Sequence, residues 1–218
     1  MSKKGKISPS MMCADFLNLE KQLRALEALN IEYLHIDIMD GTFVPNITLG
    51  TDYVKNLKKH TSIPLDIHLM VQKPEEKLNW LEFGEGDYIS FHYEATQHVH
   101  KVIQAIKSRG AYAMLAINPS TPLCVLEEVA CDLNGVLIMC VNPGFASQEL
   151  IPQSLDKIKR LRAIHPQLDI EVDGNVSFEN AVKMRNAGAN IFVSGTSGIF
   201  SKDGTLESNV KRLRECIE

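Results

Sequence analysis

Residues 33–41 read YLHIDIMDG, a short apolar run in which polar side chains recur at every second position. Side chains of a β-strand alternate between its two faces, so His35 and Asp37 point the same way. An imidazole and a carboxylate are costly to bury side by side unless something binds to them. Two later strand-like runs supply partners, because LDIHLMV contains His68 and LDIEVDG contains Asp173. We therefore expect these four side chains to form one divalent-metal site.

The same four residues also have a purely structural interpretation, in which the histidines bond to the backbone and the aspartates cap helices. For any single residue the two interpretations are equally good. All four together at strand ends favour a metal, and two neutral imidazoles with two carboxylates nearly balance a divalent charge. We expect one divalent cation, with Zn²⁺ as the first choice and Fe²⁺, Mn²⁺ or Co²⁺ as alternatives.

Short apolar runs alternate with longer amphipathic runs along the whole chain. We expect strands near residues 7–12, 33–38, 65–70, 88–93, 112–117, 135–141, 168–173 and 191–195. We expect helices near residues 15–29, 51–59, 75–83, 97–109, 122–130, 150–164, 178–187 and 205–217. Strands that alternate with helices form parallel sheets. Eight such pairs predict a single domain over residues 1–218, folded as a closed (β/α)₈ TIM barrel.

Composition bounds the class of protein. Of 218 residues, 44% are hydrophobic and the formal net charge is −4, which argues against a nucleic-acid or anionic-membrane partner. The chain has no run of about 20 apolar residues to span a membrane, and MSKKGKISPS lacks the apolar region of a signal peptide. Five cysteines without a CxxC pair indicate reduced thiols. We expect a cytoplasmic homo-oligomer.

Two glycine-containing loops follow the last two predicted strands, DGNVS at 173–177 and SGTSGIF at 194–200. Such loops often hold a phosphate in barrels, because glycine lets backbone N–H groups approach an anion closely. Thr196 and Ser197 can add hydroxyl donors. Ordinary turn chemistry would explain either loop alone, but two in adjacent units favour a phosphate site. Neither GxGxxG nor a Walker sequence is present, so we expect no nucleotide.

Three further features surround this end of the predicted barrel. The run VNPGFASQ at 141–148 is either a lid or a plain loop, and the sequence does not separate the two. Met39 and Met70 each follow a proposed ligand by two residues, so with Met139 we expect them to wall the pocket rather than only fill the core. His92, on the predicted fourth strand, is expected to approach the site.

These parts suggest proton chemistry on a small phosphorylated sugar. No lysine falls within a predicted strand, which disfavours a Schiff-base aldolase or a pyridoxal enzyme. A divalent cation that chelates a carbonyl and its adjacent hydroxyl stabilises the enediolate left by deprotonation. One aspartate can remove the proton from one face while the other returns a proton to the opposite face. That sequence of steps inverts a stereocentre.

The segments ISPSMMCADF, HIDIMDGTFVPNITLG, LDIHLMV, VNPGFASQELIP and EVDGN resemble the ribulose-phosphate 3-epimerase family over residues 6–200. The resemblance implies a (β/α)₈ TIM barrel of the ribulose-phosphate-binding type that interconverts D-ribulose 5-phosphate and D-xylulose 5-phosphate. It also implies that His35, Asp37, His68 and Asp173 bind the metal, with Asp37 as proton acceptor and Asp173 as proton donor. The substrate contacts that it implies are Ser8, His68, Gly144, Phe145, Ala146, Ser147, Gly174, Asn175, Gly195, Thr196 and Ser197.

Three departures from the family pattern keep a second substrate open. Gly174-Asn175 stands where the family usually has two glycines, GFAS stands for GFGG, and GTSGIF replaces a Gly-Ser pair followed by a small residue. The last form, with SPSMMC and HIDIMDG, is similar to the allulose-6-phosphate 3-epimerase branch, which converts D-allulose 6-phosphate to D-fructose 6-phosphate. Two other functions are disfavoured. Decarboxylases on a similar barrel resemble one another in a DxKxxD strand pattern, which this chain lacks. A non-catalytic sensor barrel would be expected to have lost one of the two aspartates, and both are present.

Overall fold

The computed structural model describes residues 3–218 as one curled sheet with helices outside it. The strands are β1 (Lys6–Pro9), β2 (Leu34–Asp40), β3 (Ile47–Thr48), β4 (Leu65–Met70), β5 (Tyr88–His92), β6 (Tyr112–Ile117), β7 (Gly135–Met139), β8 (Asp169–Asp173) and β9 (Ile191–Ser194). Their order is β1-β9-β8-β7-β6-β5-β4-β2-β3. All neighbours are parallel except the short β3, which runs antiparallel to β2.

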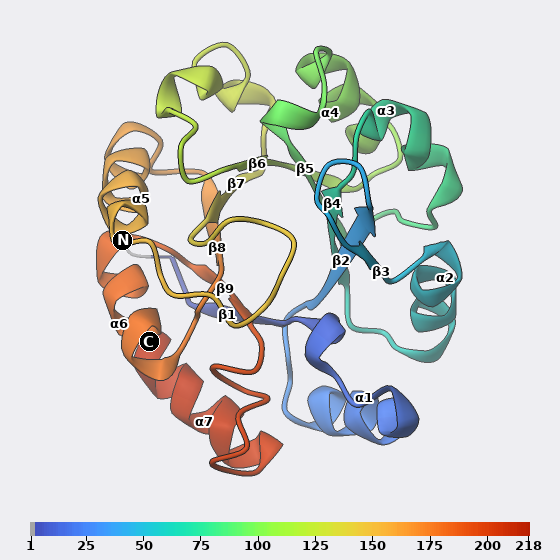
Figure 1. Ribbon diagram of the computed structural model, residues 1–218, viewed down its shortest axis with the longest axis vertical. Helices are drawn as coiled ribbons and strands as arrows, with labels where there is room; N and C mark the ends of the chain where they lie inside the picture. The colour runs from blue at the N-terminus through green and yellow to red at the C-terminus, as the bar shows by residue number, and fades with distance from the viewer. Residues whose placement is uncertain (1–2) are drawn as a thin grey trace.

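The eight parallel strands close into a barrel, because a parallel bridge joins Ser10, just after β1, to His35 in β2. Figure 1 looks along the barrel and shows the helices around the ring of strands. They are α1 (Leu19–Ala28), α2 (Thr51–His60), α3 (Pro74–Lys77), α4 (Val99–Lys107), α5 (Gln153–Ile164), α6 (Phe178–Ala187) and α7 (Leu206–Ile217). The (β/α)₈ fold predicted from the alternation of strands and helices is therefore confirmed.

Both faces of the parallel strands are covered, which explains their nearly continuous apolar sequences. All six residues of β4 are buried, and Ile67 and Leu69 belong to the large core between strands and helices. The alternate residues of β4, Asp66 and His68, are polar and fully buried or nearly so. The two-residue period of the strand thus separates an apolar outer face from a polar inner face.

The predicted helix at 122–130 is wrong, because the structure has two 3₁₀ turns there, Leu123–Leu126 and Ala130–Asp132. Pro122 precedes the first turn with an extended backbone instead of opening a helix. A long-range contact holds this segment in place: the Lys157 ammonium donates to the backbone carbonyls of Asn118, Pro119 and Thr121 at 2.7–2.9 Å. Tertiary contacts therefore override the local helix signal.

The predicted first strand also ran too far, since β1 ends at Pro9 and Met11–Cys13 form a 3₁₀ turn. The predicted helix at 75–83 begins at Pro74 but ends after one α-helical turn, followed by a 3₁₀ turn at Leu78–Trp80. Ser177 caps α6, and its side chain accepts from the Asn180 N–H.

The expectation that no lysine lies in a strand is wrong for Lys6, the first residue of β1. Its Nζ lies 3.2 Å from the Tyr33 hydroxyl and 3.8 Å from Asp169 Oδ2. Because β1 runs away from this position, Lys6 sits at the amino end of the barrel. The carboxyl end of the barrel, where the candidate site lies, receives no strand lysine among the described residues.

Candidate active site

The four predicted metal ligands meet inside the carboxyl end of the barrel. Asp37 on β2 pairs in register with His68 on β4, and Asp173 ends β8. Asp37 Oδ1 lies 3.3 Å from His35 Nε2 and 3.4 Å from His68 Nδ1. Asp173 Oδ2 lies 4.0 Å and 3.7 Å from the same two nitrogens. One atom from each side chain thus lies within 4.8 Å of all the others.

Two nitrogens of this cluster test whether the residues fit a metal. His35 Nε2 and His68 Nδ1 are both buried, and neither has a hydrogen-bond partner. A buried polar atom without a partner costs about 1–3 kcal/mol. Both nitrogens face the two carboxylates, so a divalent cation would satisfy them together with two oxygen ligands. The donor set fits a metal ion, and it does not select among Zn²⁺, Fe²⁺, Mn²⁺ and Co²⁺.

The second nitrogen of each imidazole lies within hydrogen-bond distance of a buried side chain on the side away from the aspartates. His35 Nδ1 lies 2.7 Å from Asp66 Oδ2, which also accepts from the Ser8 hydroxyl at 2.8 Å. His68 Nε2 lies 2.9 Å from Nε2 of His92, so the predicted approach of His92 is confirmed. Burial lowers the pKa of His92 to about 4, so this side chain is neutral near pH 7. Such supports orient metal-binding imidazoles in many proteins.

The two aspartates of the cluster differ in protonation. Burial opposes ionisation of Asp37, but the neighbouring His35 and His68 outweigh it and hold its pKa well below the usual range. Burial and then the negative charge of Asp37 raise the pKa of Asp173 to about 6. Environments that push two carboxyl pKa values apart mark one group as a base and the other as an acid.

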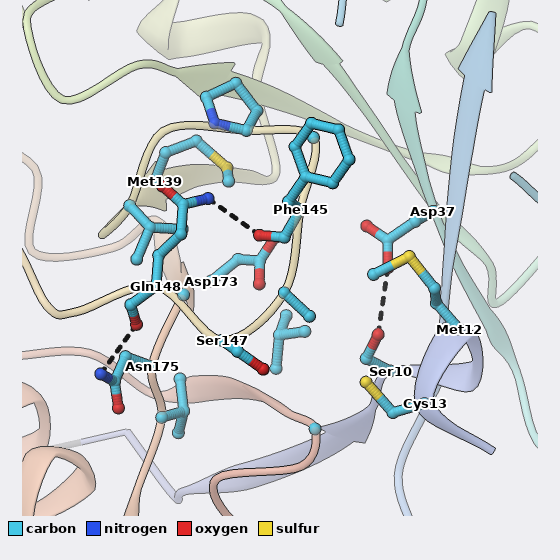
Figure 2. A pocket seen from close by; sticks show the side chains of 18 of the residues that line it. Ser10, Met12, Cys13, Asp37, Met139, Phe145, Ser147, Gln148, Asp173 and Asn175 are labelled. Carbon is cyan, nitrogen blue, oxygen red and sulfur yellow. Dashed lines mark hydrogen bonds between the residues drawn. The ribbon is translucent and has the colours of Figure 1, made fainter. Parts of the chain in front are cut away.

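A pocket opens beside the cluster, and three loops form most of its wall (Figure 2). The segment that follows β7, yellow in Figure 1, passes over the open end of the barrel. Most of the predicted substrate and wall residues line this pocket: Gly144, Phe145, Ala146, Ser147, Gly174, Asn175, Gly195, Thr196, Ser197, Met39, Met70 and Met139. Their contact with a substrate stays a prediction.

Ser8 is placed differently from the expectation that it touches the sugar. Its side chain is fully buried, bonds to Asp66 and does not line the pocket. Ser10 lines the pocket instead, and its hydroxyl donates to Asp37 Oδ2 at 3.0 Å. Both serines lie on the same strand face, so the alternation could have indicated Ser10 as the residue nearer the carboxyl end.

Two side-chain amides tie the loops of the pocket together, as Figure 2 shows. Asn175 donates from Nδ2 to the backbone carbonyl of Gln148 at 2.9 Å. Gln148 donates from Nε2 to the carbonyls of Asn142 and Phe145 at 2.6 and 2.8 Å. Asn175 and Ser147 both have positive φ, at 50° and 64°. The loop 141–148 is therefore connected to the loop after β8.

Two aspartates with oppositely shifted pKa values, in a cluster able to hold a metal ion at the carboxyl end of a (β/α)₈ barrel, form an arrangement suited to proton transfer in an enzyme. A model of the ribulose-phosphate 3-epimerase family matches residues 6–200. The chain belongs to the ribulose-phosphate 3-epimerase family, whose members are isomerases acting on carbohydrates.

Curated relatives are similar over most of their length. The ribulose-phosphate 3-epimerase of Methanocaldococcus jannaschii is 40% identical over 214 residues, covering 96% of this chain and 90% of the relative. That of Bacillus subtilis is 41% identical over 197 residues, with 88% and 91% covered. The chloroplastic ribulose-5-phosphate-3-epimerase of Arabidopsis thaliana is 41% identical over 203 residues, with 90% and 72% covered.

Solved structures with low sequence identity share the fold. A mutant tryptophan synthase alpha-subunit from Pyrococcus furiosus superposes with a TM-score of 0.67 at 17% identity, covering 100% of this chain and 98% of that chain. The 3-hexulose-6-phosphate synthase of Salmonella typhimurium gives 0.65 at 11% identity, with 97% and 98% covered. Within residues 3–218, no helix combines the length and apolar character needed to cross a membrane.

Proposed function

We propose that this epimerase interconverts D-ribulose 5-phosphate and D-xylulose 5-phosphate by inverting the stereocentre at C3. The observation that carries the proposal is the pair Asp37 and Asp173. Both carboxyl groups reach the same cluster, and their pKa values are shifted in opposite directions. An anionic carboxylate can accept the C3 proton while a carboxylic acid returns one to the other face.

The side chains around the pair fit this division of labour. Asp37 is the proton acceptor in the direction from ribulose 5-phosphate, and Asp173 is the donor; in the reverse direction their roles exchange. The Ser10 hydroxyl that donates to Asp37 Oδ2 leaves Oδ1 directed toward the cluster. Met39, Met70 and Met139 line the pocket beside the aspartates and limit access of water to the reacting carbon.

The metal ligands in this proposal are His35, Asp37, His68 and Asp173. A bound divalent cation supplies positive charge beside the substrate oxygens and so favours loss of the C3 proton. Removal of the metal with a chelator should abolish turnover. Add-back of Zn²⁺, Fe²⁺, Mn²⁺ and Co²⁺ in separate samples should restore turnover and rank the ions. Full activity after verified metal removal would eliminate the metal from the proposal.

The phosphate of the substrate is assigned to the loops after β8 and β9. Gly174, Asn175, Gly195, Thr196 and Ser197 line one part of the pocket and offer backbone N–H groups and hydroxyls. Gly144, Phe145, Ala146 and Ser147 in the loop after β7 line another part of the same pocket. The phosphorylated ketose is thus held at one end while C3 lies between the aspartates.

A second candidate substrate is D-allulose 6-phosphate, with D-fructose 6-phosphate as product. The residues that depart from the usual family pattern, Ala146, Ser147 and Asn175 among them, all line the pocket. The deciding experiment compares kcat/KM for ribulose 5-phosphate and allulose 6-phosphate under identical metal and buffer conditions. A higher value for the five-carbon sugar supports the main proposal, and a higher value for the six-carbon sugar supports the alternative. No turnover of either sugar would overturn both.

We also propose that residues 1–218 act as a single domain in a cytoplasmic homo-oligomer that has no nucleic-acid or membrane partner. The net charge of −4 supports the absence of a nucleic-acid or anionic-membrane partner, and the free cysteines support a reducing compartment. Light scattering coupled to size-exclusion chromatography tests the oligomeric state directly. A mass of one chain at micromolar concentration would contradict it.

A further inference from the structure

Two buried histidines from neighbouring strands lie in contact behind the candidate metal site. His68 on β4 and His92 on β5 are both fully buried. Their Nε2 atoms are 2.9 Å apart, which is a hydrogen-bond distance. A hydrogen bond between two ring nitrogens needs a proton on one of them and a lone pair on the other. The direction of this bond therefore decides which nitrogen of His68 carries its proton.

Glu94 lies at the far end of His92 and is itself fixed. Glu94 Oε2 lies 3.3 Å from His92 Nδ1. Its other oxygen, Oε1, accepts from the Asn118 backbone N–H at 3.0 Å and from the Thr121 hydroxyl. A backbone N–H can only donate, so Oε1 stays an acceptor. Lys157 holds the carbonyls of this same loop, so the donors to Glu94 keep their positions.

The order of donors and acceptors follows from the carboxylate. The Asn118 backbone N–H and the Thr121 hydroxyl both donate to Glu94 Oε1, which favours the carboxylate form, and a carboxylate can only accept. His92 must then carry its proton on Nδ1, and as a neutral imidazole it presents a lone pair at Nε2. His68 must donate from Nε2 to that lone pair. The remaining nitrogen, His68 Nδ1, is left with a lone pair that faces Asp37 and Asp173.

We propose that Glu94 and His92 are positioning residues that place the proton of His68 on Nε2, so that Nδ1 is free to bind the metal. Neither residue lines the substrate pocket. The proposal rests on the proposed role of His68 as a metal ligand, but the tautomer of His68 can be measured without metal or substrate.

The substitution Glu94→Gln tests the direction of the hydrogen bonds along Glu94, His92 and His68, because it keeps the shape of the side chain and replaces one acceptor oxygen by a donor NH₂ group. The Asn118 N–H still requires an acceptor, so the amide oxygen of glutamine takes the Oε1 position and the NH₂ group faces His92. His92 Nδ1 must then accept, Nε2 donates, and His68 is forced to carry its proton on Nδ1. An analogous carboxylate-to-amide change in a Ser-His-Asp triad leaves the geometry intact and fixes the wrong histidine tautomer.

The first readout is ¹⁵N NMR of histidine-labelled, metal-free protein near pH 7, with His68 assigned from the spectrum of His68→Gln. We expect a proton on His68 Nε2 in the native chain and on Nδ1 in Glu94→Gln. The second readout is the affinity for Co²⁺ alone, measured by competition with a chelator. We expect Glu94→Gln to weaken it by about 10- to 100-fold, the usual effect of losing an outer support.

Two variants serve as controls. Glu94→Asp retains a carboxylate and should keep the native His68 tautomer, which a purely space-filling role would not predict. Glu128→Gln makes the same chemical change at an exposed glutamate and should alter neither readout. These measurements involve no sugar phosphate, so they stand even if the chain turns over neither proposed substrate.

Two results would overturn the proposal. The first is a proton on His68 Nδ1 in the native, metal-free protein, which can be observed even if Glu94→Gln fails to fold. The second is a folded Glu94→Gln variant in which the His68 tautomer and the Co²⁺ affinity are both native.

Discussion

The imidazole of His35 lies against the carboxylate of Asp66, with Nδ1 2.7 Å from Oδ2. Both side chains are inaccessible to solvent or nearly so, and the Ser8 hydroxyl donates to the same carboxylate oxygen. This contact explains why His35 presents Nε2 rather than Nδ1 to Asp37. Ser8 therefore has a clear part in the site although it lies below the pocket.

Asp66→Asn should weaken metal binding by about 10-fold or more, because a neutral amide is a poorer acceptor for the His35 N–H. The measurement is Zn²⁺ affinity by chelator competition, together with the free energy of unfolding of the metal-free protein. Ser8→Ala removes only the hydroxyl that donates to Asp66, so it should lower the Zn²⁺ affinity by a smaller amount. Unchanged Zn²⁺ affinity in Asp66→Asn would show that the contact does not support the ligand.

The two aspartates should separate proton removal from epimerisation. In Asp173→Asn, Asp37 can still remove the C3 proton of ribulose 5-phosphate, so in D₂O the recovered substrate should gain deuterium while product falls by about 10³-fold or more. In Asp37→Asn, both exchange and product should be lost. Mass spectrometry and NMR of the sugar phosphate measure both quantities. Because both residues are also proposed ligands, the metal content of each variant must be matched to the native protein. Product formation near the native rate in Asp37→Asn would contradict the assignment.

The amide of Asn175 should act on the loop over the pocket and not on the chemistry. Asn175→Gly removes the bond to the Gln148 carbonyl but suits the positive φ of 50°. We expect faster amide hydrogen exchange in residues 142–149 and a KM raised about 3- to 10-fold, corresponding to a hydrogen bond of about 1 kcal/mol. Asn30→Gly is the matched control, since Asn30 is exposed and has φ of 52°. Native exchange rates in Asn175→Gly would mean that the bond does not restrain the loop.

Asp169 should make the stability of the barrel depend on acid. Its carboxylate accepts from Lys3 Nζ and the Tyr88 hydroxyl, each at 2.6 Å, and from Asn190 at 3.0 Å. Burial opposes ionisation, but these hydrogen bonds outweigh it and lower the pKa of Asp169. A lowered carboxyl pKa adds stability above the unfolded value of about 3.9, and that stability is lost as pH falls through the folded value.

Asp169→Asn should therefore cost roughly 1–3 kcal/mol of unfolding free energy at pH 7, and the difference from the native protein should shrink below about pH 3.9. Urea unfolding of the metal-free protein at several pH values measures both. Asp203→Asn, at an exposed aspartate, should leave the profile unchanged. A deficit in Asp169→Asn that is independent of pH would assign the effect to packing instead of charge.

The barrel and the cluster of four candidate metal ligands could be predicted from the sequence because both depend on short-range periodicity. The two-residue spacing of His35 and Asp37 fixes a shared strand face, and parallel strands bring their carboxyl ends together. His92 ends β5 and Glu94 lies in the 3₁₀ turn that follows, so strand alternation gave no signal for the contact behind His68. Ser8 was expected from the family resemblance alone, and the structure places Ser10 instead of Ser8 in the pocket wall.

Other features depend on contacts between distant residues, which no local pattern contains. Lys157 reaches carbonyls 36–39 positions earlier in the chain, and the helix predicted at 122–130 is replaced by 3₁₀ turns beside that contact. β3 has only two residues, too few for a strand period to be recognised. The opposed pKa values of Asp37 and Asp173 likewise depend on burial and on each other, and only the folded chain provides both.

The adjacent residues Gly174 and Asn175 differ in how freely they can change during evolution. Gly174 has φ of 112°, and an added Cβ would lie 2.9 Å from the Val141 backbone nitrogen. Asn175 has a left-handed φ of 50°, which asparagine and glycine adopt readily. Position 174 therefore accommodates only glycine, whereas the backbone at position 175 accommodates either glycine or asparagine. An exchange of asparagine for glycine at position 175 would leave the backbone turn intact and remove the hydrogen bond that connects it to the loop above the pocket.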